Sequence, residues 1–337
     1  MSIKGAILGL FTADAASVNS HWLYPKFFSE KYAEFVEKAN GAPEFIEPIY
    51  NPFYRQPLSP YASQSIVLLE SLIAKNGFDR ADYAARLFET FGPNTVYDNP
   101  PKVVNPLVGN PVQGGMCNAS IRNFLQVYKE KGAEGETGLS HDNQADGYSK
   151  IPIIVAFYAG NPNLPKIIEE ILSVTQDCTE SLRTSIAAAR LFEAALQGKF
   201  TAESFDAFLN GTQFQDGIIE TTRKELQTLH DATTSLEEFS TNGLGNLACT
   251  VPGSFYTALY SLRNSMRETT THSELFLKTI RDTILLNGCN ASRASYLGAL
   301  LGAAYGLSII PDHFLTKTQN VTRYKDLANK LEVLTQK

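Results

Sequence analysis

The side chains best suited to catalysis are five histidines and four cysteines, and their spacing matches no familiar catalytic or metal site. Zinc sites and disulfide frameworks use closely spaced cysteines, and helical metal sites pair histidines four residues apart. Neither spacing occurs here. We therefore expect reduced thiols and mostly structural histidines. These residues are His21, His141, His230, His272 and His313, with Cys117, Cys178, Cys249 and Cys289.

A polar, turn-like segment at 287–293 leads directly into a helix striped with glycine. Glycine costs about 1 kcal/mol per helix position relative to alanine, so regularly spaced glycines indicate that another backbone packs closely against them. The segment 3–16 repeats the four-residue spacing. We expect these two helices to cross at the centre of the fold and to position the polar turn. The small residues are Gly298, Gly302 and Gly306 in one helix, and Gly5, Gly9 and Ala13 in the other.

Apolar residues recur at helical spacing along most of the chain, and glycine or proline ends most segments. No alternating strand pattern or internal repeat is found. The sequence therefore predicts an all-α fold with a single domain over 1–337. Further helices are predicted over 26–38, 63–75, 80–91, 116–129, 144–158, 164–175, 182–196, 202–210, 217–228, 253–266 and 273–286.

Two stretches, 40–61 and 92–115, have no helical pattern and are rich in proline or glycine. Irregular segments of this length in a compact domain commonly frame a site, and the aromatic residues of the first argue against disorder. We expect both to border a ligand pocket. The glycine-rich loop at 109–115 lacks the lysine and spacing of a phosphate-binding loop.

Charge and hydropathy exclude several classes of protein. The net charge is −6, the isoelectric point is near 5.5 and no basic run occurs, so we expect no nucleic-acid partner. The apolar run at 3–11 lacks the features of a signal peptide. The apolar run at 295–310 is too short to span a bilayer and predicts a buried helix. We expect a cytoplasmic protein with no membrane partner.

Five segments resemble, in order and spacing, the successive signatures of the ADP-ribosylglycohydrolase family. Within that family, the phrases Val251 to Phe255 and Asn290 to Ala294 are most similar to the branch that contains selenoprotein J and the J-type crystallins of jellyfish lenses. The resemblance implies a compact orthogonal helical bundle. It also implies that active members hold two magnesium ions, which bind ADP-ribose and assist cleavage of its glycosidic bond. The five segments are Gly5 to Ala15, Ser63 to Ser65, Asp146 to Pro152, Thr179 to Gly198 and Asn287 to Gly306.

The same resemblance places neutral side chains where active members carry acids. The family's Thr-Asp-Asp-Thr falls on Ala62 to Ser65, its Asp-Thr-Asp-Thr falls on Cys289 to Ser292, and a glutamate falls on His21. Magnesium prefers carboxylate and water oxygens. We therefore expect no metal, no cofactor and no catalytic residue at these positions. The degenerate pocket comprises His21, Ser63, Gln64, Ser65, Cys289, Ala291 and Ser292.

Some polar residues of the family pattern remain and form a candidate pocket for an ADP-ribose-like small molecule. Asp14 is one of them, although an acid within a helix of small residues more often accepts hydrogen bonds from a neighbouring helix end. A reactive thiolate at Cys289, activated by His21, is a further hypothesis. The retained residues are Asp14, Asp146, Gly147, Tyr148 and Asn290.

The resemblance leads to three functional hypotheses. The first is a catalytically inactive homologue that serves as a structural eye-lens crystallin of the J type. The second is an ADP-ribosyl glycohydrolase that uses another metal or none. The third is a metal-free ADP-ribose-binding module. Self-association is left open by the sequence.

Overall fold

The structure is a computed structural model, and it describes residues 2–47, 56–98, 115–241 and 243–336. Within these residues the chain forms helices and two isolated β-bridges, with no strand. The all-α fold is therefore confirmed. The α-helices are α1 (Ile3–Ser17), α2 (Ser29–Ala39), α3 (Pro60–Lys75), α4 (Arg80–Phe91), α5 (Ala119–Lys131), α6 (Asp146–Tyr158), α7 (Leu164–Leu172), α8 (Thr179–Leu196), α9 (Ala202–Leu209), α10 (Glu220–Asp231), α11 (Leu236–Thr241), α12 (Gly253–Glu268), α13 (His272–Leu285), α14 (Asn290–Tyr305), α15 (Asp312–Lys317) and α16 (Val321–Thr335). Short 3₁₀ helices are η1 (Val18–Ser20), η2 (Gly132–Glu134) and η3 (Leu307–Ile309).

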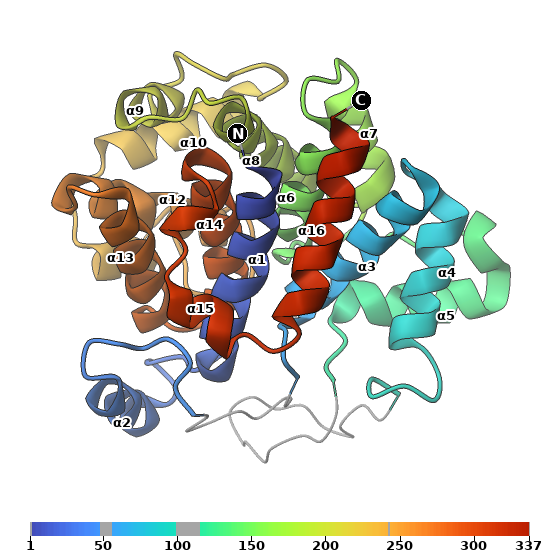
Figure 1. The fold of residues 1–337 in the computed structure, drawn as a ribbon, viewed down its shortest axis with the longest axis horizontal. Helices are drawn as coiled ribbons and strands as arrows, with labels where there is room; N and C mark the ends of the chain where they lie inside the picture. Colours follow the sequence, from blue (N-terminus) through green and yellow to red (C-terminus); the bar gives the residue numbers. More distant parts are fainter. Residues whose placement is uncertain (1, 48–55, 99–114, 242, 337) are drawn as a thin grey trace.

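The helices α1 and α14 pack along each other at the centre of the molecule (Figure 1). A Cβ added at Gly5 or Gly9 would overlap the carbonyl oxygen of Gly302 or Gly298, respectively. A Cβ at Gly298 would also lie 2.5 Å from the Ala13 methyl. The backbones are therefore in direct contact, as the glycine spacing predicts. Because Gly5 faces Gly302 and Gly9 faces Gly298, the two helices run antiparallel.

Several helix boundaries differ from the predictions made from the sequence, and two of these differences have a clear local cause. Pro60 starts α3 one turn before the predicted helix, because proline suits the first helical position and Ser59 caps it. The helix expected through 310 ends at Tyr305. Gly306 adopts φ +89° beyond its end, so this glycine terminates α14 rather than extending its stripe.

The sequence also left helices α11, α15 and α16 unpredicted. The last is the most important omission, because α16 packs on α1 and lies beside it in Figure 1. Its inner side chains Tyr324, Leu327, Ala328 and Leu331 are buried. Residues 48–55 and 99–114 of the two irregular stretches lie outside the described residues, so the pocket they were expected to border stays a prediction.

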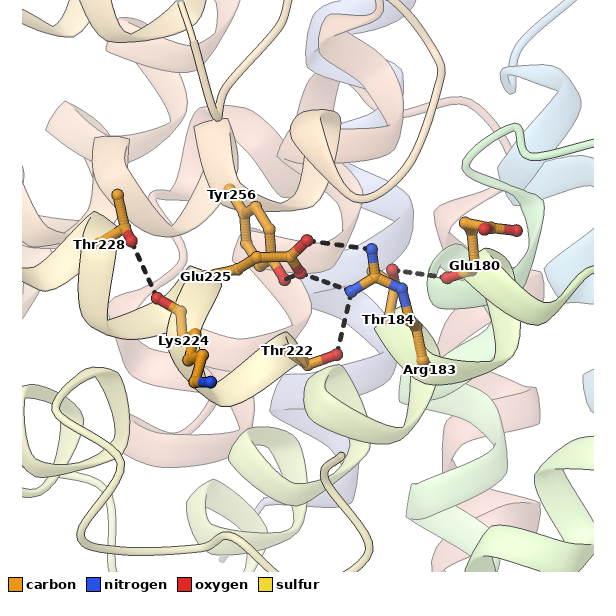
Figure 2. Close-up of polar contacts among 8 residues, drawn as sticks. All are labelled: Glu180, Arg183, Thr184, Thr222, Lys224, Glu225, Thr228 and Tyr256. Carbon is orange, nitrogen blue, oxygen red and sulfur yellow. Dashed lines mark hydrogen bonds and ion pairs between the residues drawn. The ribbon is translucent and has the colours of Figure 1, made fainter. Parts of the chain in front are cut away.

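A polar cluster joins α8, α10 and α12 away from the glycine crossing (Figure 2). The Arg183 guanidinium donates two hydrogen bonds to the Glu225 carboxylate, at 2.5 and 3.2 Å, and one to Thr222. The Tyr256 hydroxyl donates to the same carboxylate at 2.7 Å. The two charged side chains are only 14% and 22% exposed, so this ion pair is poorly screened and well oriented.

We predict that Gly302→Ala lowers the free energy of unfolding by at least about 3 kcal/mol or prevents soluble expression, because the methyl group would overlap the Gly5 carbonyl. Chemical denaturation measures the change. Gly41→Ala is the control: its backbone is also unfavourable at φ +82°, but the added Cβ meets no described atom within 4 Å. It should cost about 1 kcal/mol. Equal losses would contradict the close crossing.

We predict that Arg183→Met destabilises the protein by roughly 1–2 kcal/mol, because the half-buried Glu225 side chain loses the guanidinium that donates to it. Lys224→Met is the matched control on the neighbouring turn of α10. Its ion pair with Glu220 is 72% and 70% exposed and should contribute less than about 0.5 kcal/mol. Urea denaturation of both variants compares them. A smaller effect for Arg183→Met than for Lys224→Met would refute a stabilising role for the cluster.

Candidate functional site

The antiparallel crossing brings the segment after α1 against the start of α14. His21 Nδ1 lies 3.1 Å from Asn290 Oδ1 and accepts a hydrogen bond from the Ala291 backbone N–H at 3.2 Å. The Asn290 amide donates to the Ser20 hydroxyl at 2.7 Å. These residues are all buried. Three of the positions predicted from the sequence, His21, Asn290 and Ala291, therefore meet in one place.

A second group of buried side chains joins α3, α6 and α14. The Cys289 sulfur lies 3.3 Å from the Tyr61 hydroxyl and 3.2 Å from the Ser292 hydroxyl. Tyr148 donates to Ser292 at 3.0 Å. The thiol and hydroxyls of the degenerate pocket thus interact mainly with one another. Tyr61, which completes the group, was not identified from the sequence.

The retained acid Asp146 stands at the start of α6 and binds amide groups. Its Oδ1 accepts hydrogen bonds from Gln64 Nε2, at 2.5 Å, and from the Asn118 side chain. Burial raises the pKa of Asp146 above its ordinary value, while the charge of buried Lys150 opposes the shift. The next residue, Gly147, faces α8 so closely that a Cβ there would lie 2.7 Å from the Ser185 hydroxyl.

The remaining predicted residues point elsewhere. Ser65 donates to the backbone oxygens of Tyr61 and Ser149, both at 3.1 Å, and is fully buried between α3 and α6. The Ser63 hydroxyl accepts from Tyr97 at 3.3 Å and lines a separate cavity of about 170 Å³. The sequence pattern does not show whether the Ser63 side chain faces this separate cavity or the degenerate pocket.

Asp14 is bonded to the end of a neighbouring helix. The backbone N–H and the hydroxyl of Ser59, the N-cap of α3, donate to its two oxygens at 2.8 and 2.5 Å. Burial, opposed by these bonds, raises the pKa of Asp14 to about 7. Its geometry matches the structural interpretation made from the sequence, in which an acid in a small-residue helix binds an adjacent helix end.

The geometry does not support a thiolate activated by His21. The Cys289 sulfur contacts the hydroxyls of Tyr61 and Ser292, and burial raises its thiol pKa well above the ordinary value. Burial lowers the pKa of His21 to about 3, so the ring is neutral at physiological pH. A neutral imidazole carries no positive charge that could stabilise a neighbouring thiolate.

The donor groups at the degenerate positions do not fit magnesium. They are an imidazole, a thiol, amides, hydroxyls and a methyl group, whereas Mg²⁺ favours charged oxygen ligands in octahedral geometry. The acids Asp14 and Asp146 are bonded to Ser59 and to amides, at different helix starts. Among the described residues, no group of three or more His, Cys, Asp or Glu side chains is arranged to hold a metal ion.

The ADP-ribosylglycohydrolase family model matches residues 2–337, and the chain belongs to this family. A solved structure described as an ADP-ribosylglycohydrolase-related protein complex superposes with a TM-score of 0.66 at 20% identity, covering 99% of this chain and 97% of that one. This likeness supports the fold.

Two curated relatives come from the jellyfish Tripedalia cystophora. Crystallin J1A is 29% identical over 337 residues, covering 99% of this chain and 97% of its own length. Crystallin J1B is 28% identical over 321 residues, covering 94% and 91%. The branch indicated by the sequence phrases is thus represented among the similar proteins. In the described part of the chain, no helix combines the length and apolar character needed to cross a membrane.

We predict that His21 destabilises the folded protein in acid, because its folded pKa of about 3 lies below the unfolded value near 6.5. The unfolded chain then binds the extra proton, so stability is complete above about pH 6.5 and is lost as the pH falls toward 3. The free energy of unfolding of the wild type, relative to His21→Gln, should fall by up to ~1.4 kcal/mol per unit between pH 6 and pH 4. His141→Gln, at an exposed position, is the control. Parallel curves for wild type and His21→Gln would contradict a buried neutral His21.

Proposed function

We propose that this protein is a structural crystallin that retains the fold of a glycohydrolase without its paired magnesium site. One observation carries the proposal. The positions where active relatives hold metal are occupied by neutral side chains that bond to one another, as Cys289 does to Tyr61 and Ser292, and Asn290 to Ser20. Two divalent ions in such a buried site would lack compensating negative charge.

The similarity to two crystallins over nearly the whole chain supports the lens role. Composition is compatible with it. The net charge of −6 favours solubility at high concentration, and only three methionines and four cysteines are open to oxidation. A cytoplasmic location would follow from that role, since lens proteins act inside fibre cells.

A second candidate, a metal-free binder of an ADP-ribose-like molecule, is favoured by a different observation. Among the described residues, His21 Nε2, Gln64 Oε1 and Asp146 Oδ2 are buried without hydrogen-bond partners. Unpaired buried polar atoms are uncommon and are often satisfied by water or by a ligand. They lie on residues of the degenerate pocket and of the candidate ligand pocket. Hydrolysis of an ADP-ribosyl bond would additionally need a group to activate water, and the neutral donors do not offer one.

We predict that neither millimolar magnesium nor ADP-ribose, alone or together, raises the melting temperature of the purified protein. A ligand present at 100 times its dissociation constant would stabilise the native state by ~2.7 kcal/mol, which scanning calorimetry detects as a shift of several degrees. An active member of the family, measured in parallel, serves as the positive control.

The other outcomes of this measurement distinguish the glycohydrolase from the metal-free binder. A shift that needs both ligands would overturn the proposal and favour the glycohydrolase, and release of ADP-ribose should then be assayed. A shift with ADP-ribose alone would establish the metal-free binder. If no shift occurs, quantitative proteomics of lens tissue should find the protein among the most abundant components, and scarcity there would refute the crystallin role.

A further inference from the structure

Two of the four cysteines, distant in sequence, lie together beside the degenerate pocket. The thiol of Cys289 is within hydrogen-bonding reach of the Cys249 sulfur. Their backbones are joined next to this contact, where the Cys289 N–H donates to the Leu247 carbonyl at 2.7 Å. Cys249 is partly exposed, whereas Cys289 is fully buried.

Aromatic hydrogen-bond donors surround the more exposed sulfur. The Trp22 indole N–H donates to Cys249 Sγ at 3.3 Å, and the Tyr24 hydroxyl lies 4.0 Å from it. Trp22 adopts φ +67°, a backbone conformation that side chains other than glycine rarely occupy. Strained residues of this kind cluster at functional sites. The strain places the indole against the sulfur.

A buried cation lies near the Cys289 thiol without an acidic partner among the described residues. Arg293 is fully buried and donates to the backbone oxygens of Leu247 and Asn287, the residues that flank the pair. Among the described residues, no carboxylate forms an ion pair with Arg293. A buried guanidinium without a counter-charge is costly, and a thiolate nearby would neutralise it.

These contacts shift the pKa values of the two thiols in opposite directions. Hydrogen bonding from Cys289, and then from Tyr61 and Trp22, lowers the pKa of the Cys249 thiol to about 7 despite burial. Burial and the neighbouring Cys249 raise the pKa of Cys289 well above its usual range. Burial also raises the pKa of Cys117, another partly exposed cysteine, to about 12.

We propose that Cys249 and Cys289 form a peroxide-reactive pair, in which Cys249 is oxidised first and Cys289 then closes an intramolecular disulfide. The substrate class is a small hydroperoxide. This activity is independent of the proposed lens role and of any binding of ADP-ribose.

The two steps balance in atoms and electrons. The Cys249 thiolate attacks the outer peroxide oxygen, the O–O bond breaks, and the leaving oxygen takes a proton and departs as water or an alcohol. Cys249 is then a sulfenic acid. The Cys289 sulfur loses its proton and attacks the Cys249 sulfur, and the S–O bond breaks with release of water. Two thiols lose two electrons, which the hydroperoxide gains. Two molecules of a small thiol restore the pair by exchange.

The test treats the native wild-type protein with hydrogen peroxide below one equivalent, blocks the remaining thiols, and maps the cysteines by mass spectrometry. We expect a Cys249–Cys289 disulfide that dithiothreitol reverses. In Cys289→Ser, dimedone should trap a sulfenic acid at Cys249 at least about ten-fold faster than at Cys117, which is the exposure-matched control. Cys249→Ser should remove both products, and Cys178→Ser should leave both unchanged.

Two results would overturn the proposal. One is oxidation of Cys249 no faster than that of Cys117 in the native protein. The other is a Cys249–Cys289 disulfide that forms only after denaturation. Both are measured on the wild type, so they remain decisive if a serine variant fails to fold. Circular dichroism of each variant separates loss of reactivity from loss of structure.

Discussion

The direct backbone contact between α1 and α14 is the constraint on which the rest of the structure depends. Because Gly5 and Gly9 face Gly302 and Gly298, no side chain separates the two helices. Their antiparallel direction then places the residues after α1 beside the start of α14, and His21 meets Asn290. The site is thus positioned by residues that take no part in its chemistry. Tolerance to substitution should be lower along the crossing than in the site it positions.

Once the helices are fixed, electrostatics determines what the site can do. A buried site that holds two divalent ions needs several carboxylates, and removing these acids while keeping the ions would leave charge without compensation. The chain has instead become neutral at these positions. Its histidine is uncharged, its thiol and hydroxyls bond to one another, and Asp14 caps a helix through Ser59. The hydrogen bonds among these neutral groups are compatible with a static structural role, as the crystallin proposal requires.

The sequence predicted the features that depend on local periodicity. The glycine spacing identified the central crossing, and the predicted limits of α4 agree with the structure because Asp79 caps one end and Gly92 follows the other. It could not identify contacts between distant residues. Neither the Gln64 and Asn118 bonds to Asp146 nor the approach of Cys249 to Cys289 leaves a local pattern. The helix α16 was missed although its buried residues Tyr324, Leu327, Ala328 and Leu331 have the i, i+3, i+4, i+7 spacing of an amphipathic helix, so this omission was not forced by the sequence.

The replacement of acids connects the two proposals physically. The resemblance to active relatives places Cys289 where they have an aspartate, and Arg293 lies only one turn further along α14. The buried Arg293 guanidinium donates hydrogen bonds to the backbone oxygens of Leu247 and Asn287. Burial raises the pKa of the Cys289 thiol while the charge of Arg293 opposes the shift, whereas hydrogen bonds lower the pKa of the Cys249 thiol. The proposed loss of the family's acids therefore leaves two thiols at the helix end where the proposed peroxide chemistry takes place.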